Sequence, residues 1–420
     1  MPSSNVVKRY KDAKNVFADN GVDTEKALGS LRGLTLSLPC WQADDVRGSE
    51  THAGSVETLR ITGEYPGRSR NNDEIRRDLE KILALIPGRH RLSLHAMYGD
   101  FGGKRVDRDA IEASHFSAWI DWAAATRIAM DFNATCFMHP LADSGFTLSH
   151  PDASVRGFWI EHVRRSRAIA AHIGRSLGSC SLHNLWIPDG SKDVRFDDAT
   201  PRRILVESLD AAYATRHPET DMKDFMESKL FGIGSEAYVV GSHEFYIGYA
   251  LTRKLRVCLD LGHYHPTESV ADKISSLLLF TDEVLLHVSR GVRWDSDHVP
   301  VLDDDLRDLA RRIVRGGFMG RVHVGMDFFD ASINRVGAYV VGARAVQKAF
   351  LSALLEPANA LRKAEASGDL FTRLALQEEA RLLPVGAVWD YFCETENTPP
   401  ADAWIAAVKA HERDVLLKRA

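Results

Sequence analysis

The stretch VLLHVSRGVRWDSDHVPVLDDDLRDLARRIVRGGFMGRVHVGMD, residues 284–327, combines two local patterns. Short apolar runs at 284–288 and 322–327 are typical of buried β-strands. Between them, residues 303–315 begin with three acids and continue with apolar residues at spacings of three and four, which predicts an amphipathic helix. A strand, a helix and a second strand in this order predict two parallel strands joined by a helical crossover.

The same alternation runs through most of the chain. Eight short apolar runs have strand character, and segments of helical length separate them. Eight such units close into a barrel without exposed edge strands, so we predict an α/β fold of the (β/α)8 TIM-barrel type. An open, doubly wound sheet is the alternative, and it would bind its ligand at a single switch point. The predicted strands cover residues 34–38, 92–95, 128–132, 181–187, 224–229, 257–260, 284–288 and 322–327.

The chain has 420 residues, which is more than the ~250 that a plain barrel needs. We predict an N-terminal helical segment over residues 1–33, the barrel over 34–356 with a metal site at its C-terminal face, and a C-terminal helical extension over 357–420. The extension is too long to belong to the barrel, and we expect it to form an oligomer contact.

Composition argues against several classes of protein. The net charge is −5 and basic residues form no long run, so we expect no nucleic-acid partner. The five cysteines are scattered and form no Cys-x-x-Cys pair, which predicts reduced thiols and a cytoplasmic location. The N-terminus lacks the apolar core of a signal peptide, and no apolar stretch approaches the ~20 residues of a membrane span. We therefore expect neither secretion nor a membrane partner.

The run Asp303, Asp304 and Asp305 has two interpretations. It resembles a cluster of metal ligands, but acids at the start of a helix also offset the positive end of the helix dipole. The amphipathic pattern that follows favours the helix start.

Four successive predicted strands end in carboxylate or imidazole side chains. Acids at adjacent strand ends repel one another, and burying them together is costly without a cation. Their number exceeds what one ion needs, so we predict two divalent metal ions. Oxygen and imidazole ligands without thiolate favour Mn²⁺, with Mg²⁺, Co²⁺ or Zn²⁺ as alternatives. The candidate ligands are Glu227, Asp260, His263, His287, Asp295, Asp297 and Asp327.

Four more side chains are expected at the same barrel mouth. Lys229 lies on the same side of its strand as Glu227 by two-residue alternation, and it would anchor a substrate hydroxyl or an oxyanion. Trp186 and His95 end predicted strands, and Trp41 follows another. Aromatic rings in such positions commonly form an apolar wall against a sugar, although a tryptophan is more often simple packing. From these residues alone, an isomerase and a hydrolase both remain open.

Six longer motifs resemble those of a known family, the bacterial L-rhamnose isomerases. The similarity extends to their spacing and covers nearly the whole chain. The motifs are CWQADDV (40–46), TGEYPG (62–67), ESKLFGIG (227–234), GHYHPTE (262–268), VRWDSDH (292–298) and GMDFFDASINR (325–335).

The resemblance implies a homotetramer of (β/α)8 subunits that interconverts L-rhamnose, an aldose, and L-rhamnulose, a ketose, at the start of L-rhamnose catabolism. It implies a structural metal ion, which holds substrate oxygens, on Glu227, Asp260, His287 and Asp327. It implies a second, catalytic ion on His263, Asp295 and Asp297. The implied sugar contacts are Lys229, Trp186 and His95, with Trp41 and Phe132 as further aromatic candidates.

We expect Asp297, Lys229 and His95 to take part in catalysis. His95 would assist the proton transfer that opens the sugar ring. A water held by Asp297 would then remove the proton of the C2 hydroxyl, while hydrogen moves from C2 to C1 as a hydride. An enediol route with a protein base competes with this hydride shift. The alternative functions are another metal-dependent aldose isomerase, a metal-dependent barrel hydrolase, and a sugar-binding protein without turnover.

Overall fold

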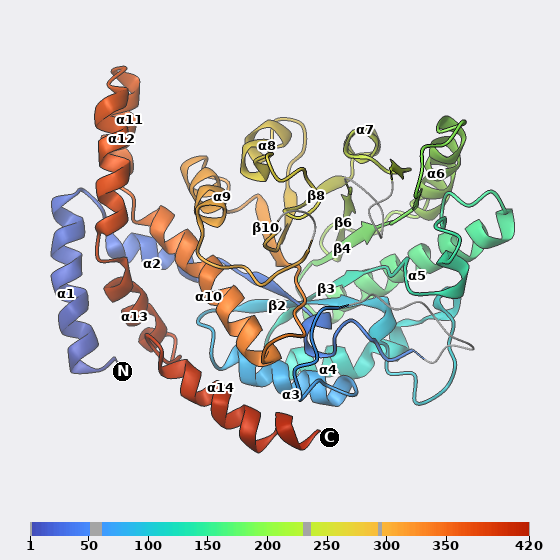
Figure 1. Cartoon of the computed structure of the whole chain (residues 1–420), viewed down its shortest axis with the longest axis horizontal. Coiled ribbons are helices and arrows are strands. Elements are labelled where there is room, and N and C mark those ends of the chain that lie inside the picture. Colours follow the sequence, from blue (N-terminus) through green and yellow to red (C-terminus); the bar gives the residue numbers. More distant parts are fainter. Residues whose placement is uncertain (1, 51–60, 230–236, 293–295, 420) are drawn as a thin grey trace.

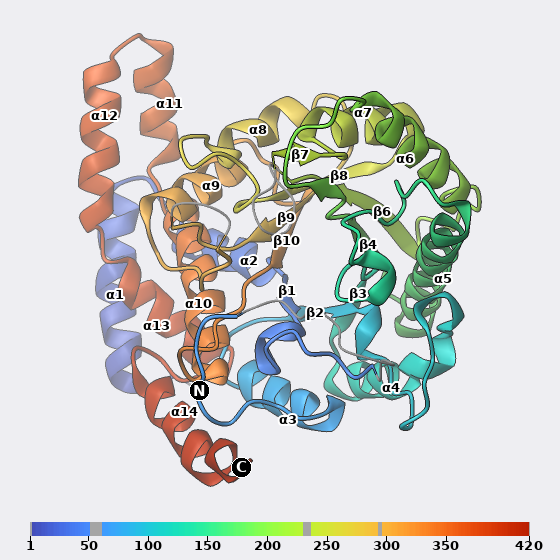
Figure 2. The ribbon, with the colours of Figure 1, turned by 45° about the vertical axis from the view of Figure 1, so that its right-hand side comes forward.

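The computed structural model describes residues 2–50, 61–229, 237–292 and 296–419. Within them, parallel strands form a closed eight-stranded barrel in the order β1-β10-β9-β8-β6-β4-β3-β2 (Figure 2). The predicted (β/α)8 barrel is confirmed, and the ends of the predicted strands shift by at most two residues. The barrel strands are β1 (Leu36–Pro39), β2 (His90–His95), β3 (Ala129–Asn133), β4 (Ser181–Trp186), β6 (Met222–Glu227), β8 (Arg256–Asp260), β9 (Val284–Val288) and β10 (Val322–Met326).

In the described part of the chain, one α-helix follows each barrel strand, and these helices surround the barrel (Figures 1 and 2). A short antiparallel pair, β5 (Gly190–Ser191) and β7 (Tyr238–Val239), is added outside the barrel sheet. The surrounding helices are α3 (Asn72–Leu83), α4 (Ser117–Thr126), α5 (Ala153–Leu177), α6 (Ala199–Ala212), α7 (His243–Arg253), α8 (Val270–Leu277), α9 (Asp304–Arg315) and α10 (Arg335–Leu354).

The barrel strands are buried along most of their length because both of their faces are covered. Every residue of β8 and of β9 is buried. One face of a parallel barrel strand meets the helices and the other meets the barrel interior, so the strands need no alternation of polar residues. The interior holds a small cluster made of Leu182, Phe225, Cys258 and Leu285. Residues two positions further along these four strands point to the same side and reach the mouth of the barrel.

The acidic run before α9 is the start of a helix, as the sequence favours. The Asp303 side chain accepts a hydrogen bond from the backbone N–H of Leu306 at 3.0 Å and so caps the helix. Asp304 and Asp305 lie in the first turn. Among the described residues, the groups of side chains close enough to share a metal ion include none of these three acids.

Helices before and after the barrel pack against each other. The helices α1 (Ser4–Asp19) and α2 (Thr24–Arg32) precede β1. Figures 1 and 2 show α1 beside α13 (Val385–Thr395), and the rings of Tyr10 and Tyr391 stack there with centroids 3.9 Å apart. The segments that follow the barrel are α11 (Ala358–Ala366), α12 (Leu370–Glu379), α13 (Val385–Thr395) and α14 (Ala403–Asp414).

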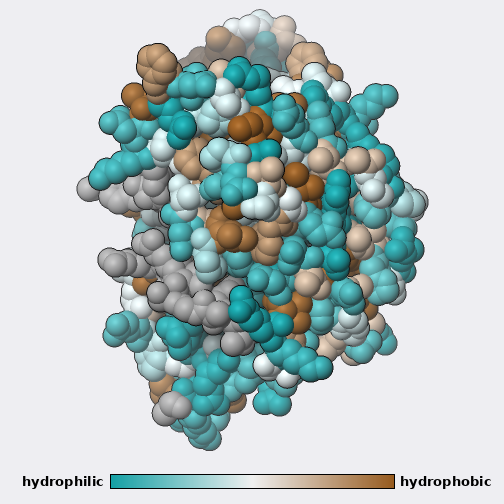
Figure 3. Space-filling model, turned by 90° about the vertical axis from the view of Figure 1, so that its right-hand side faces the viewer, coloured by the Kyte–Doolittle hydropathy of each residue, from teal (hydrophilic) through white to brown (hydrophobic). Residues whose placement is uncertain are grey.

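Among the described residues, no helix is both long and apolar enough to cross a membrane. On the face shown in Figure 3, hydrophobic side chains lie in small separate groups among hydrophilic ones. Scattered apolar residues of this kind are ordinary on protein surfaces.

Candidate active site

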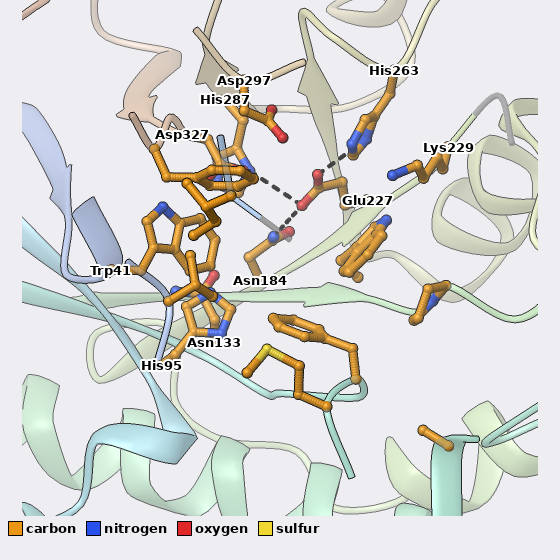
Figure 4. Close-up of a pocket in the computed structure, with 18 of the residues that line it drawn as sticks. Trp41, His95, Asn133, Asn184, Glu227, Lys229, His263, His287, Asp297 and Asp327 are labelled. Carbon is orange, nitrogen blue, oxygen red and sulfur yellow. Dashed lines mark hydrogen bonds and ion pairs between the residues drawn. The ribbon is translucent and has the colours of Figure 1, made fainter. Parts of the chain in front are cut away.

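A cavity of about 950 Å³ opens at the carboxyl ends of the barrel strands (Figure 4). Parallel strands bring all of their carboxyl ends to one rim, so side chains far apart in sequence meet there. The structure therefore gathers most of the predicted site residues in one place. Its lining includes Trp41, His95, Trp186, Glu227, Lys229, His263, His287, Asp297 and Asp327.

Four of the predicted ligands form one tight cluster. Ligand atoms of Glu227, Asp260, His287 and Asp327 all lie within 4.8 Å of one another. His287 Nδ1 is 3.2 Å from Glu227 Oε2 and 3.1 Å from Asp327 Oδ2. The same nitrogen is 3.8 Å from Asp260 Oδ2. It is buried and makes no hydrogen bond within the described part of the chain, although three carboxylates surround it.

The charges in this cluster are poorly balanced by protein groups alone. Burial alone would raise the pKa of Glu227, but the neighbouring His287 and His263 lower it to about 2. Burial raises the pKa of Asp327 above its usual value. One carboxyl is thus held ionised while its neighbour is pushed towards protonation, as expected when like charges share a site. A divalent cation would relieve this conflict, so the donor set fits a metal ion.

Cys258 also lies within reach of Glu227 and His287. Burial raises the pKa of the Cys258 thiol, which keeps it protonated. A metal ion needs the thiolate form, so carboxylate and imidazole donors are favoured here.

Asn184 belongs to this site, although the sequence analysis did not select it. Its side-chain amide donates a hydrogen bond of 2.5 Å to Glu227 Oε2. The two strands are in register, with Trp186 opposite Glu227. The available signal was position: Asn184 lies two residues before Trp186 on the same strand, so both side chains face the mouth.

His263 and Asp297 lie on the neighbouring part of the cavity wall (Figure 4). His263 Nδ1 is 3.2 Å from Glu227 Oε1, which joins this group to the first cluster. Asp297 has a positive φ of 42°, a backbone strain that is common at functional sites. Asp295, the third predicted member of this group, lies outside the described residues.

Aromatic and cationic side chains form another wall of the cavity. Lys229 Nζ lies 4.8 Å from the ring centroid of Trp186, within the range of a cation–π contact. The ring of Phe137 meets Trp186 edge-on at 5.4 Å, and this phenylalanine also lines the cavity. Phe137 comes from the loop after β3, where the sequence has no periodic pattern to single it out.

His95 and Trp41 pack against each other in the cavity wall, with ring centroids 4.3 Å apart and an angle of 41° between the planes. His95 Nδ1 is 3.2 Å from the Thr135 hydroxyl oxygen. Burial lowers the pKa of His95 well below its usual value, so its imidazole is neutral near pH 7. A neutral ring has one nitrogen that donates and one that accepts, which suits it to exchanging a proton with a hydroxyl.

The structure contradicts the placement of Phe132 in the sugar-binding wall. Phe132 is fully buried. Its ring packs edge-on against that of Phe116, the residue just before α4, with centroids 4.9 Å apart. It is not among the residues that line the cavity, whereas the next residue, Asn133, is. Successive side chains of a strand point to opposite faces, so Phe132 faces the helices. Phe137, in the loop after this strand, lines the cavity.

Comparison with known proteins places the chain in a family. Residues 4–419 match the family model of L-rhamnose isomerase (RhaA). An L-rhamnose isomerase of Rhodopirellula baltica is 50% identical over 418 residues, which cover 99% of this chain and 98% of that protein. An L-rhamnose isomerase of Salmonella paratyphi A is 52% identical over 408 residues, 97% of each chain.

Solved structures show a more distant likeness. A structure of L-ribulose 3-epimerase is 14% identical and covers 74% of this chain and 98% of that one, with a TM-score of 0.44. A likeness at this level says nothing about the substrate. The family match and the two relatives span nearly the full length, and on these grounds the chain belongs to the L-rhamnose isomerase family.

Proposed function

We propose that this protein interconverts L-rhamnose and L-rhamnulose as the first step of L-rhamnose catabolism. The family match and two full-length relatives with that name support the proposal. The single structural observation that carries it is the buried cluster of three carboxylates and an imidazole at the floor of a sugar-sized cavity. Such a cluster suits an aldose–ketose isomerase that depends on metal ions.

The proposed cofactor is a pair of divalent ions, with Mn²⁺ preferred and Mg²⁺, Co²⁺ or Zn²⁺ as alternatives. The first ion would be held by Glu227, Asp260, His287 and Asp327. The second would be held by His263 and Asp297, together with Asp295. When bound, the ions supply Lewis-acid polarisation of the sugar's C1 and C2 oxygens.

The protein's own residues would orient the sugar and move its protons. His95 is neutral and faces the cavity, so it would shuttle a proton between ring oxygen and hydroxyl during ring opening. Lys229 would donate to a substrate oxygen, while Trp186 and Trp41 pack against the carbon skeleton. These contacts fix the orientation of C1 and C2 before the chemical step.

In the chemical step, the C2–H bond would break with its electron pair, and that pair would form the new C1–H bond. The C2 hydroxyl loses its proton towards Asp297 through a water, and the C1 oxygen gains a proton. A 1,2-hydride shift of this kind keeps the transferred hydrogen out of contact with solvent. Conversion in D₂O should therefore leave no deuterium at C1, whereas the competing enediol route would wash deuterium in.

A ketose colour assay on L-rhamnose, with and without EDTA, tests the proposed function. We expect ketose formation that EDTA abolishes and added Mn²⁺ restores. Turnover of a different aldose in preference to L-rhamnose would indicate another isomerase, and binding without turnover would indicate a sugar-binding protein. A metal-dependent hydrolase of phosphate esters is disfavoured, because Lys229 is the single Lys or Arg among the described residues that line the cavity.

We further propose a homotetramer in which the C-terminal helical extension over 357–420 forms an oligomer contact. Helix α12 supports this, because it buries no residue in the single chain. Three of its apolar side chains are exposed, namely Leu370, Phe371 and Leu374. Light scattering behind a sizing column tests the tetramer.

We also propose a cytoplasmic location. All five cysteines are unpaired, as in proteins of a reducing compartment. Fractionation of the source cells would test the location.

A further inference from the structure

Ser228 and His243 lie just behind the wall of the cavity, and neither lines it. Ser228 stands at the end of β6 between two cavity residues, Glu227 and Lys229, and is 2% exposed. His243 is the first residue of α7. Their position suggests a supporting role for the residues in front of them.

Three hydrogen bonds join Ser228, His243 and His263 to one another. Ser228 Oγ lies 2.5 Å from His243 Nδ1. His243 Nε2 lies 2.8 Å from the backbone carbonyl oxygen of His263. His263 Nδ1 lies 2.8 Å from the backbone carbonyl oxygen of Ser228. The three bonds form a closed triangle that ties the end of β6, the loop after β8 and the start of α7 together.

The chemistry of the partners fixes the direction of each bond. A carbonyl oxygen only accepts, so His243 Nε2 carries a hydrogen and donates it to His263. With the ring hydrogen on Nε2, Nδ1 of His243 is the accepting nitrogen, and it accepts from the Ser228 hydroxyl. By the same rule, His263 Nδ1 donates to the backbone carbonyl oxygen of Ser228. In a neutral His263 ring the lone pair then lies on Nε2, the nitrogen that a metal ion would use.

Aromatic stacking holds His243 in place. Its ring lies parallel to that of Tyr264, with centroids 4.0 Å apart and an angle of 7° between the planes. Lys273 Nζ also contacts the Tyr264 ring, at 4.6 Å from its centroid. His243 is therefore fixed both by its ring face and by its two nitrogens.

We propose that His243 is a positioning residue that, through Ser228, sets the orientation and tautomer of His263 for metal binding. The inference rests on the proposed function, because it takes His263 as a metal ligand. Residues that orient metal ligands in this way typically change metal affinity by about 10–100-fold when they are replaced.

The test is a titration of the metal-free, full-length protein with Mn²⁺, read as the EPR signal of free Mn²⁺. The variant His243→Phe keeps a ring on Tyr264 and removes both hydrogen bonds. We expect one of the two Mn²⁺ sites to weaken by about 10–100-fold and the other to stay within about twofold of the wild type. His243→Gln, whose amide still donates to the carbonyl, should give an intermediate affinity.

His90→Phe is the matched control. His90 is also buried, and its Nε2 lies 3.1 Å from the carbonyl oxygen of Pro87, but it starts β2 at the opposite end of the barrel. Its replacement should leave both Mn²⁺ affinities unchanged. Thermal unfolding of all three metal-free variants shows whether each is folded.

The outcomes separate the inference from the proposed function, because the titration uses no sugar. Unchanged binding by a folded His243→Phe protein overturns the role of His243 alone. Equal weakening of both sites also overturns it, because that result indicates a general loss of the barrel mouth. A wild-type protein that binds fewer than two Mn²⁺ ions overturns the proposed two-ion site and this inference with it.

Discussion

Asp327, whose side chain is 13% exposed, adds a third carboxylate to a cluster that already holds Glu227 and Asp260. Burial raises the pKa of Asp327, so its ionised form is costly without a cation beside it. The metal ion should therefore stabilise the folded protein as well as enable turnover. A ligand that binds only the folded state at 100 times its Kd adds about 2.7 kcal/mol to the free energy of unfolding.

We predict that Asp327→Asn removes most of this gain. Urea unfolding with Mn²⁺ and with EDTA should show a metal-dependent difference for the wild type and little or none for the variant. Ketose formation should fall by more than about 100-fold. Replacing a residue that only orients a metal ligand already lowers metal affinity or activity by about 10–100-fold. Asp143→Asn is the control, since Asp143 lines the same cavity outside the cluster. A variant at Asp327 that kept the full metal-dependent gain would contradict the assignment.

Residue type and strand position were enough to find the cluster. Glu227, His287 and Asp327 follow or end apolar runs, and parallel strands bring such ends together. Asn184 was missed because an asparagine carries no chemical signature of its own, and its one signal was its position two residues before Trp186 on the same strand. Phe132 was misplaced because one residue along a strand reverses the direction of the side chain. The role of Asp295 stays a prediction.

Helix α9 shows how a local acid run serves the helix itself. Asp303→Ala should lower the free energy of unfolding by about 1 kcal/mol, because the backbone N–H of Leu306 loses its cap. Mn²⁺ affinity should not change. Chemical unfolding and the Mn²⁺ titration measure the two effects separately. A loss of metal binding without a loss of stability would instead favour the metal-cluster interpretation.

The regular elements were predictable because burial imposes a local pattern on them, an apolar run in the strands and a helical period in the helices. All eight barrel strands and the helix start at Asp303 follow from such patterns. The irregular loops have no period, and they supply Ile61, Phe137 and Met138 to the cavity. Their paths depend on long-range hydrogen bonds, such as that from the Tyr65 backbone N–H to the Ala331 carbonyl, which no local sequence pattern encodes.

Several histidines are buried in neutral form across the molecule, and this makes its stability depend on pH. Burial lowers the pKa of His90 to about 4 and that of His162 to about 3, and it lowers the pKa of His95 well below its usual value. The unfolded chain takes up protons near pH 6.5 and the folded chain does not. The free energy of unfolding should therefore fall as pH drops below about 6.5, by about 1.4 kcal/mol per unit for each such histidine.

Urea unfolding at pH 7, 6 and 5 measures this slope. His90→Phe should reduce the slope by the share of one histidine, about 1.4 kcal/mol per pH unit. One buried carboxylate acts in the opposite sense: burial raises the pKa of Asp44 to about 7, so in this range the folded chain keeps a proton on Asp44 that the unfolded chain has lost. The wild type and His90→Phe share this contribution, so it cancels from the difference between them. The pKa of Asp224 is about 2, because Arg167 and His183 outweigh the effect of burial, so its contribution is lost only below about pH 4. A slope that is the same in the variant and the wild type would refute the assignment to His90.

The C-terminal helix α14 reaches the rim of the cavity. Glu412 accepts hydrogen bonds from the Tyr65 hydroxyl and from the side-chain amide of Asn334, the latter at 2.9 Å. These partners lie next to residues that line the cavity, Ile61 and Thr62 on one side and Ser332 on the other. The last helix therefore supports two rim segments at once.

We predict that Glu412→Ala lowers the free energy of unfolding by about 1–3 kcal/mol, since a buried amide loses its partner. It should also raise the KM for L-rhamnose more than it lowers kcat, because the two rim segments line the cavity away from the metal-ligand cluster. Steady-state kinetics measure both constants. Glu394→Ala is the control. Glu394 lies in α13 and accepts a hydrogen bond of 2.6 Å from the backbone N–H of Ser3, so its replacement should leave KM unchanged. An equal change in KM for both variants would count against a specific role of Glu412.

Closure of the barrel has a consequence for how the protein is made. Strand β1 pairs with β10, and the paired residues Leu36 and Val324 are 288 positions apart. At about 5–20 residues per second, a ribosome needs roughly 15 to 60 s to travel between them. Throughout that time one edge of β1 has no strand beside it and remains open to pairing with other chains. The growing polypeptide is therefore most prone to aggregation until β10, the last strand of the barrel, has been made.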